Sequence, residues 1–267
     1  MLAPDLHQTS SALTNVFLTV AKVASYAEAL QSLSDDPAVT GRGQASPNLA
    51  LPHTTWSSTD WLETVCTPLV VNLPRAIATY DRKFQQVANS LIDLQTELAS
   101  KENRTTSGQQ KRAVTLLTDL RACLGSCEPA MKVHQDRLIT VLGSIHCDAV
   151  SLQSLDLHRE RDDTEKTRSS SAGQFNARLR TALDLRHQVV EDRVTAIQSI
   201  RQTFGIFRYT NRMVDRLLED LANGAAKDVV AILDEARLPA ARRVWAELSA
   251  TARALAANQL NARHGIS

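Results

Sequence analysis

Glycine, proline and aromatic residues are scarce in this chain, and their scarcity narrows the choice of fold. The 267 residues include only 9 Gly and 8 Pro, and aromatic residues make up 4%. Most of the Gly and Pro residues fall outside the periodic stretches described below. This composition is typical of a mostly helical protein. Because aromatic side chains are so few, we expect leucine, isoleucine and valine to form most of the core.

Charge, cysteine and long apolar runs are limited as well. The net charge is +1, and neither a basic excess nor a basic stripe stands out, so we expect no nucleic-acid partner. The chain has no run of about 18 apolar residues, so we expect no membrane-spanning helix. Four cysteines are too few for a disulfide scaffold in a chain of this length.

The N-terminal residues also lack a recognisable targeting signal. Met1-Leu-Ala-Pro-Asp has neither the basic region nor the apolar region of a secretory signal peptide. We therefore expect synthesis as a soluble protein in the cytoplasm, with the cysteines reduced.

A hydrophobic seam over residues 117–155 is the clearest positive signal. Its members follow one another in steps that alternate between three and four residues, over more than five heptads. Such a pattern predicts one long helix that packs lengthwise on others. The seam positions are Leu117, Leu120, Leu124, Cys127, Met131, His134, Leu138, Val141, Ile145, Asp148, Leu152 and Leu155.

Gly125 and Pro129 lie inside this seam and leave its continuity open. The heptad phase survives across both residues, which favours a bend within one helix. A break into two helices is the alternative, because an interior proline costs a helix about 3 kcal/mol.

Further helices are predicted on both sides of the seam. The first spans about 6–33. A second begins near residues 58–60, should be kinked or divided by Pro68 and Pro74, and ends near 102. A fourth has a seam that includes Leu179, Leu183, Val190 and Val194, with one stutter at Val190–Val194, and it ends at Asn223-Gly224. Short helices then follow at about 225–236 and 240–262.

Two polar segments separate these helices. Residues 34–57 form a linker rich in Pro, Gly, Ser and Asp, and residues 158–173 form a polar tip between the two longest helices. The tip allows those two helices to run antiparallel. We therefore predict an all-α fold, with residues 1–267 forming a single elongated antiparallel helical bundle that has a short C-terminal helix.

The sequence offers little evidence of catalytic or metal chemistry. No Gly-rich phosphate loop, nucleophile elbow or metalloprotease motif is present. Cys123, Cys127 and His134 lie on roughly one helix face and are the best metal candidates, but seam positions favour a core role and a fourth ligand is missing. His146 and Cys147 are adjacent, so their side chains point about 100° apart and do not form a nucleophile pair. We expect no cofactor, no metal and no catalytic site.

Two apolar groups are candidate membrane or partner surfaces. The first helix is the least polar one, and its apolar face includes Val16, Phe17, Val20 and Val23. The second group is the stretch of sequence richest in aromatic residues, and it contains Phe204, Phe207 and Tyr209. Both groups also fit a plain core role, because Phe204 and Phe207 are in phase with the seam and the first helix could be buried centrally.

The second predicted helix opens with a pattern that is similar to a known family. The residues are Trp61, Leu62, Pro68, Leu69, Leu73, Tyr80 and Phe84, with Trp245 in a C-terminal helix. They resemble the α-helical pore-forming toxins, in particular the haemolysin BL and non-haemolytic enterotoxin components of the cytolysin A superfamily. The order of elements is also similar, from an apolar first helix to a short C-terminal one. The resemblance covers about residues 6–260 and is specific at residues 61–84.

The resemblance has one clear departure, at the polar tip. The toxins carry a head with an apolar tongue between their two longest helices, whereas residues 158–173 are polar here. The resemblance therefore implies a tail-only member. Toxins of this superfamily divide labour among components, so a sister toxin subunit or self-association is the implied partner, together with a target membrane. Many of them leave cells without a cleavable signal, so secretion is compatible with the sequence.

These observations lead to one expected function and two alternatives. We expect a non-enzymatic component of an α-helical pore-forming toxin, which acts by conformational rearrangement and assembly on a membrane or with a partner subunit. The main alternative is a structural coiled-coil adaptor without membrane activity. A curvature-sensing membrane module is the other, although the near-neutral charge argues against it.

Overall fold

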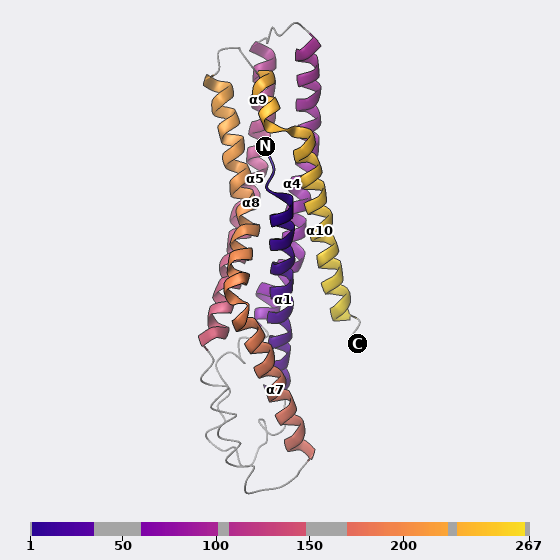
Figure 1. Ribbon diagram of the computed structural model, residues 1–267, viewed down its shortest axis with the longest axis vertical. Coiled ribbons are helices and arrows are strands. Elements are labelled where there is room, and N and C mark those ends of the chain that lie inside the picture. The colour runs from indigo at the N-terminus through magenta and orange to yellow at the C-terminus, as the bar shows by residue number, and fades with distance from the viewer. Residues whose placement is uncertain (1, 35–59, 101–106, 148–169, 224–228, 265–267) are drawn as a thin grey trace. The chain divides into compact units, whose positions relative to one another are not determined.

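The computed structural model (Figure 1) describes residues 2–34, 60–100, 107–147, 170–223 and 229–264. All regular elements in these ranges are helices, and none of the described residues forms a strand. The predicted all-α helical bundle is therefore confirmed. No helix within the described ranges combines the length and the apolar character needed to cross a membrane.

The first helix, α1 (Leu6–Ser34), has nearly the predicted bounds. Asp5 caps it, because its Oδ1 atom accepts a hydrogen bond from the Gln8 backbone N–H at 2.7 Å. Apart from Ser34, which ends α1, the predicted linker at 34–57 lies outside the described residues.

The second helix accommodates its two prolines without ending. It begins at Asp60 and passes through a π-helical turn, η1 (Leu62–Cys66), into α4 (Thr67–Ser100). Pro68 has no N–H to donate to the Thr64 carbonyl, and Arg137 Nη1 donates to that oxygen instead, at 3.3 Å. The helix thus changes its winding just before Pro68 and continues as α-helix through Pro74.

The helix of the long seam is continuous over its described length. It forms α5 (Ser107–Cys147) with Pro129 inside it, so the alternative of two separate helices is wrong. Most seam residues up to Ile145 are buried, whereas Cys127 and His134 are partly exposed. Asp148, Leu152 and Leu155 lie outside the described residues.

The fourth predicted helix is in fact two helices. They are α7 (Ser170–Glu191) and α8 (Arg193–Asn223), separated at Asp192 where the sequence shows the stutter. The backbone N–H of Asp192 still donates to the Gln188 carbonyl, so the interruption is local. Residues 170–173, predicted to belong to the polar tip, begin α7, and residues 158–169 lie outside the described ranges.

The core positions of α7 also differ from the prediction by one residue. Leu183 and Val190 were expected in the core and are half-exposed, and Val194 is 68% exposed. Leu179 is buried as predicted, and the other buried residues from 175 to 196 are Phe175, Ala182, Arg186, Val189 and Ala196. The prediction failed because a charged residue, Arg186, occupies a core position.

A tight corner joins the last two helices, α9 (Val229–Ala236) and α10 (Leu238–His264). Arg237 adopts a positive φ of 47° at this corner, and its backbone N–H donates to the Asp234 carbonyl at 3.0 Å. Pro239 follows in the first turn of α10, where a missing N–H leaves no helical hydrogen bond unmade.

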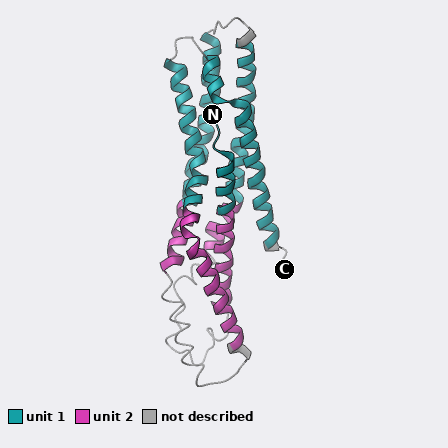
Figure 2. Ribbon diagram, viewed as in Figure 1, with its two compact units in different colours: residues 1–15, 71–135, 198–267 teal, residues 16–70, 136–197 magenta. Residues whose placement is uncertain are grey.

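The described helices divide between two compact units (Figure 2). Unit 1 contains residues 1–15, 71–135 and 198–267. Within it, α4 contacts α5 through Lys83–Asp119, and α5 contacts α8 through Arg121–Asp215 and Glu128–Arg208. In the α5–α8 pairs, residue numbers rise along one helix as they fall along the other. The two helices are therefore antiparallel, as predicted.

Unit 2 contains residues 16–70 and 136–197. Lys22 of α1 forms an ion pair with Asp192, and Arg178 of α7 donates to the Ser32 carbonyl at 3.3 Å. These two contacts make α1 and α7 antiparallel neighbours in this unit. The prediction of a single domain over 1–267 stays a prediction.

Arg186 caps the C-terminal end of α5 from within unit 2. Its side chain is only 8% exposed, and its guanidinium donates to the carbonyls of Ile145 and His146, each at 3.3 Å. The last four carbonyls of a helix have no partner inside it, and they carry partial negative charge. The buried cation is thus stabilised by a helix end, since no carboxylate among the described residues pairs with it.

Replacing Arg186 with methionine is expected to lower the free energy of unfolding by about 1.5–3 kcal/mol, the usual contribution of hydrogen bonds to a charged group. Urea unfolding monitored by circular dichroism measures the change. Arg180→Met is the matched control, because Arg180 lies exposed on the same helix and its loss should change stability by less than about 0.5 kcal/mol. Equal effects of the two substitutions would contradict the capping role.

Candidate functional site

Four aromatic side chains from three helices meet in unit 1, and we call them the aromatic cluster. They are Tyr80 and Phe84 of α4, Phe207 of α8 and Trp245 of α10, all fully buried. The ring centroids of Tyr80 and Trp245 are 4.3 Å apart in an edge contact, and Phe84 and Phe207 lie 6.4 and 6.3 Å from Trp245. Each such contact adds about 0.5–1.5 kcal/mol beyond area burial. The cluster therefore holds α4, α8 and α10 together.

The residues that precede α1 dock directly beside this cluster. The Trp245 indole Nε1–H donates to the Leu2 carbonyl at 3.1 Å, and the Leu2 backbone N–H donates to the Ala236 carbonyl at 3.0 Å. Leu2 and Ala3 are both buried. The N-terminal segment (residues 2–5) is thus attached to the α9–α10 corner by two hydrogen bonds, one of which comes from an aromatic-cluster side chain.

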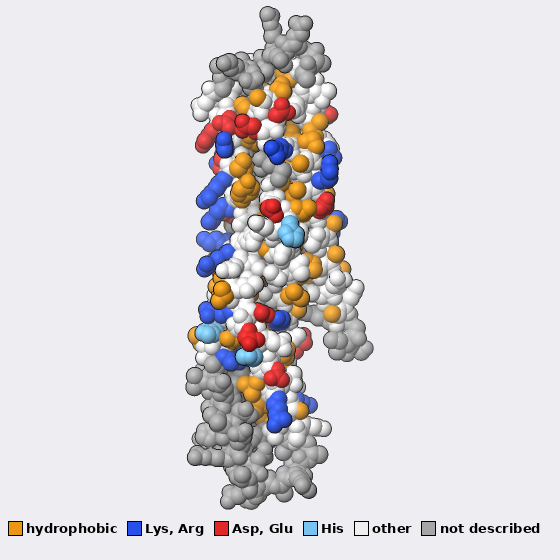
Figure 3. Space-filling view, viewed as in Figure 1, with side chains coloured by type: hydrophobic (Ala, Val, Ile, Leu, Met, Phe, Trp, Pro, Cys, Tyr) orange, Lys and Arg blue, Asp and Glu red, His pale blue; other side chains and the backbone are white. Residues whose placement is uncertain are grey.

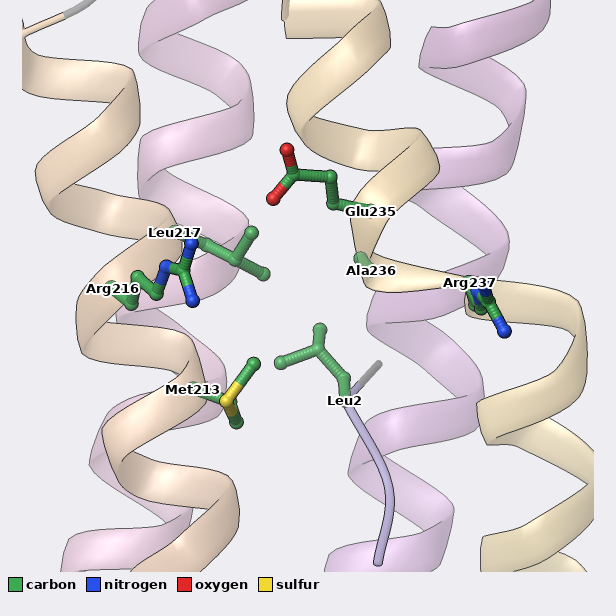
Figure 4. Close-up of a pocket in the computed structure, with 7 residues that line it drawn as sticks. All are labelled: Leu2, Met213, Arg216, Leu217, Glu235, Ala236 and Arg237. Atoms are coloured by element: carbon green, nitrogen blue, oxygen red, sulfur yellow. The ribbon is translucent and has the colours of Figure 1, made fainter.

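A cavity of about 340 Å³ lies next to this attachment. In Figure 4 the Leu2 side chain faces Met213 and Leu217 of α8, while Glu235 extends from α9 above it. Arg237 points away on the far side of the corner. The described residues that line the cavity are Leu2, Met213, Arg216, Leu217, Glu235, Ala236 and Arg237. Leu2 therefore lines this cavity while its own side chain is fully buried.

The apolar face predicted for α1 is buried. Val16, Phe17, Val20 and Val23 are each at most 1% exposed. On the opposite side of the same stretch, Leu18 is 54% exposed. The face predicted to move or dock is thus covered by other parts of the chain in this structure.

The other predicted surface is divided. Phe204 and Phe207 are buried, and Phe207 belongs to the aromatic cluster. Tyr209, two residues further along α8, is 47% exposed. Only Tyr209 of this group is therefore available to a partner without rearrangement.

Most residues of the family-like motif are core residues. Trp61, Leu69 and Leu73 are buried, as are Tyr80, Phe84 and Trp245, whereas Leu62 and Pro68 are half-exposed. Tyr80, Phe84 and Trp245 come together in the aromatic cluster, although Trp245 is far from the other two in sequence.

Folding also produces a basic stripe that the sequence analysis missed. Arg201, Arg208, Arg212 and Arg216 are exposed on α8, and their spacing of seven, four and four residues places them on one face. Figure 3 shows Lys and Arg side chains gathered along the edge of the molecule where α8 lies. Arg208 and Arg216 pair with Glu128 and Asp220, while no described carboxylate pairs with Arg201 or Arg212. The helical spacing was the signal that could have revealed this stripe.

Cys123 and Cys127 lie together on α5, but His134 does not join them. The two thiols are hydrogen-bonded to each other, and this bond lowers the pKa of Cys127 to about 7 and raises the pKa of Cys123. His134 Nε2 instead lies 3.2 Å from Asn72 Nδ2. In the described part of the chain, no three His, Cys, Asp or Glu side chains are placed to hold a metal ion.

No family model matches this chain, and no curated protein matches it significantly.

Proposed function

We propose that this protein is a non-enzymatic component of an α-helical pore-forming toxin, and that it acts by moving α1 out of the bundle onto a membrane or a sister subunit. The buried apolar face of α1 is the observation that carries the proposal. This helix contains only two residues of type Asp, Glu, Lys or Arg, namely Lys22 and Glu28, and Val16, Phe17, Val20 and Val23 are inaccessible. The bundle interior stabilises the apolar face of this helix relative to water. A lipid bilayer or an apolar partner surface could stabilise the same face.

Three polar contacts between α1 and other parts of the chain are exposed or only partly buried. The Lys22–Asp192 ion pair is solvent-exposed, and such pairs contribute about 0–1 kcal/mol. Asn15 donates to Ser199 at 3.2 Å, and Arg178 donates to the Ser32 carbonyl. Apolar burial contributes strongly to holding α1 in place, since Val16, Phe17, Val20 and Val23 are each at most 1% exposed. Lipid or an apolar partner surface can replace that burial, because the hydrophobic effect is not directional.

The basic stripe of α8 supports the part of the proposal that concerns membrane binding. Exposed basic residues attract an anionic lipid surface by about 1 kcal/mol each. Tyr209 is exposed next to Arg208, and tyrosine is favoured at membrane–water interfaces. The stripe of α8 would bring the protein to the membrane first, and movement of α1 would follow. Insertion of a tongue is not part of the proposal, because residues 158–169 are polar.

A crosslink between α1 and the α7–α8 break tests the proposal. Lys22→Cys/Asp192→Cys would be joined by a short bis-maleimide in a chain whose Cys123, Cys127 and Cys147 are serine. Dye release from vesicles that contain anionic lipid is measured, alone and with proteins encoded beside this one. We expect release with the uncrosslinked protein and loss of release after crosslinking.

The matched control is Lys22→Cys alone, treated with the same reagent, which should still release dye. Undiminished release from the crosslinked double variant would show that α1 does not move. Absence of dye release in every mixture would contradict the proposed toxin function. A stable oligomer in light scattering that does not respond to lipid would favour the coiled-coil adaptor.

A further inference from the structure

Two half-buried thiols face each other on α5, at the side that α4 covers. Cys123 and Cys127 are one helical turn apart on one face of α5, and both are half-buried. Lys83 of α4 lies within electrostatic reach of Cys123, and the buried phenol of Tyr80 lies within reach of both thiols. The remaining described cysteines differ, since Cys66 is buried and Cys147 is exposed. The pair is therefore the only described place where two thiols can react with each other.

We propose that Cys123 and Cys127 form an oxidation site, in which a hydroperoxide oxidises Cys127 and Cys123 then closes an intrahelical disulfide. In the first step the Cys127 sulfur attacks the peroxide, the O–O bond breaks, and an alcohol or water leaves. In the second step the Cys123 sulfur attacks the resulting sulfenic acid, the S–O bond breaks, and water leaves with the Cys123 proton. The peroxide is reduced, and the two thiols are oxidised.

The asymmetry of the pair assigns the order of these steps. Cys123 donates its S–H to Cys127, which stabilises the thiolate of Cys127, and the pKa of Cys127 is accordingly lowered to about 7. The thiolate is the form that attacks a peroxide. Cys123 keeps its proton, because the same hydrogen bond raises its pKa. Cys127 is therefore the attacking thiol, and Cys123 is the resolving one.

The geometry of α5 predicts a structural consequence. Side chains four residues apart on a helix have Cβ atoms about 5–6 Å apart, whereas a disulfide needs about 3.5–4.5 Å. The helix must open locally to close the bond. Gly125 lies between the two cysteines, and its carbonyl would normally accept from residue 129, which is proline and has no N–H. This stretch of α5 thus lacks one backbone hydrogen bond, so opening it locally requires less free energy than opening a fully hydrogen-bonded turn.

Mass spectrometry of the full chain tests the proposal after treatment with hydrogen peroxide and alkylation of the remaining thiols. Trypsin should release residues 122–132, which contain both cysteines. We expect this peptide to escape alkylation and to weigh about 2 Da less than the reduced peptide. This change should occur before Cys147 is oxidised. The melting temperature should fall on oxidation and recover with dithiothreitol, because the disulfide distorts α5.

Two variants separate the roles of the thiols. Cys123→Ser should stop at the sulfenic acid of Cys127, which dimedone labels, and its melting temperature should not change on oxidation. Cys127→Ser should show neither disulfide nor rapid labelling. Oxidation of Cys147 while residues 122–132 remain reduced would overturn the proposal, and so would equal dimedone labelling of the two variants.

Discussion

Replacing Trp245 with alanine is expected to lower the free energy of unfolding by about 3–5 kcal/mol, the usual cost of truncating a buried large aromatic side chain. The indole contacts Tyr80, Phe84 and Phe207, and the substitution leaves a cavity among them. The Leu2 carbonyl also loses its donor. Urea unfolding monitored by circular dichroism measures the loss.

Two companion variants separate packing from hydrogen bonding. Trp245→Phe keeps an aromatic ring but removes the N–H donor, and we expect a smaller loss of about 1–3 kcal/mol. Tyr209→Ala removes an exposed aromatic residue and should change stability by less than about 0.5 kcal/mol. If Trp245→Ala proved as mild as Tyr209→Ala, the aromatic cluster would not be the element that holds α10.

Replacing Phe17 with alanine is expected to have an effect of similar size, a loss of about 3–5 kcal/mol. Phe17 is 1% exposed on the buried face of α1. Its neighbour Leu18 provides the matched control, because it belongs to the same helix and is 54% exposed. Leu18→Ala should stay within about 0.5 kcal/mol. Both variants are measured by urea unfolding, and equal losses would show that burial does not distinguish the two faces of α1.

The Phe17 variant also bears on the proposed function. If release of α1 limits the rate of membrane action, weakening its packing should shorten the lag before dye release while the final amount falls, since the inserted helix is less apolar. Unchanged release kinetics alongside the expected loss of stability would indicate that α1 stays in place during activity.

The sequence was most informative where local periodicity and tertiary packing agree. The seam of α5 predicted a continuous helix across Pro129, and the structure confirms it. The motif residues Tyr80, Phe84 and Trp245 proved to be neighbours, although the sequence could not show that they touch, because nothing local links α4 to α10.

Two features could not be predicted from periodicity, for different physical reasons. In α7 the buried positions differ by one residue from the predicted ones, and Arg186 is among them. A pattern based on hydrophobic residues places arginine on the surface. It also does not show that the carbonyls at the end of α5 need hydrogen-bond donors. The attachment of Leu2 depends on backbone groups at the α9–α10 corner, and backbone groups leave no trace in a side-chain pattern.

The bond between Trp245 and Leu2 gives the molecule a built-in optical reporter. An indole that is fully buried and hydrogen-bonded to the segment ahead of α1 changes its surroundings as soon as that segment leaves. Departure would admit water to the ring and shift its emission to longer wavelength. Comparing the wild-type chain with Trp245→Phe isolates this signal from that of the other tryptophans. Stopped-flow fluorescence on mixing with vesicles would then time the detachment of the N-terminal segment without any added label.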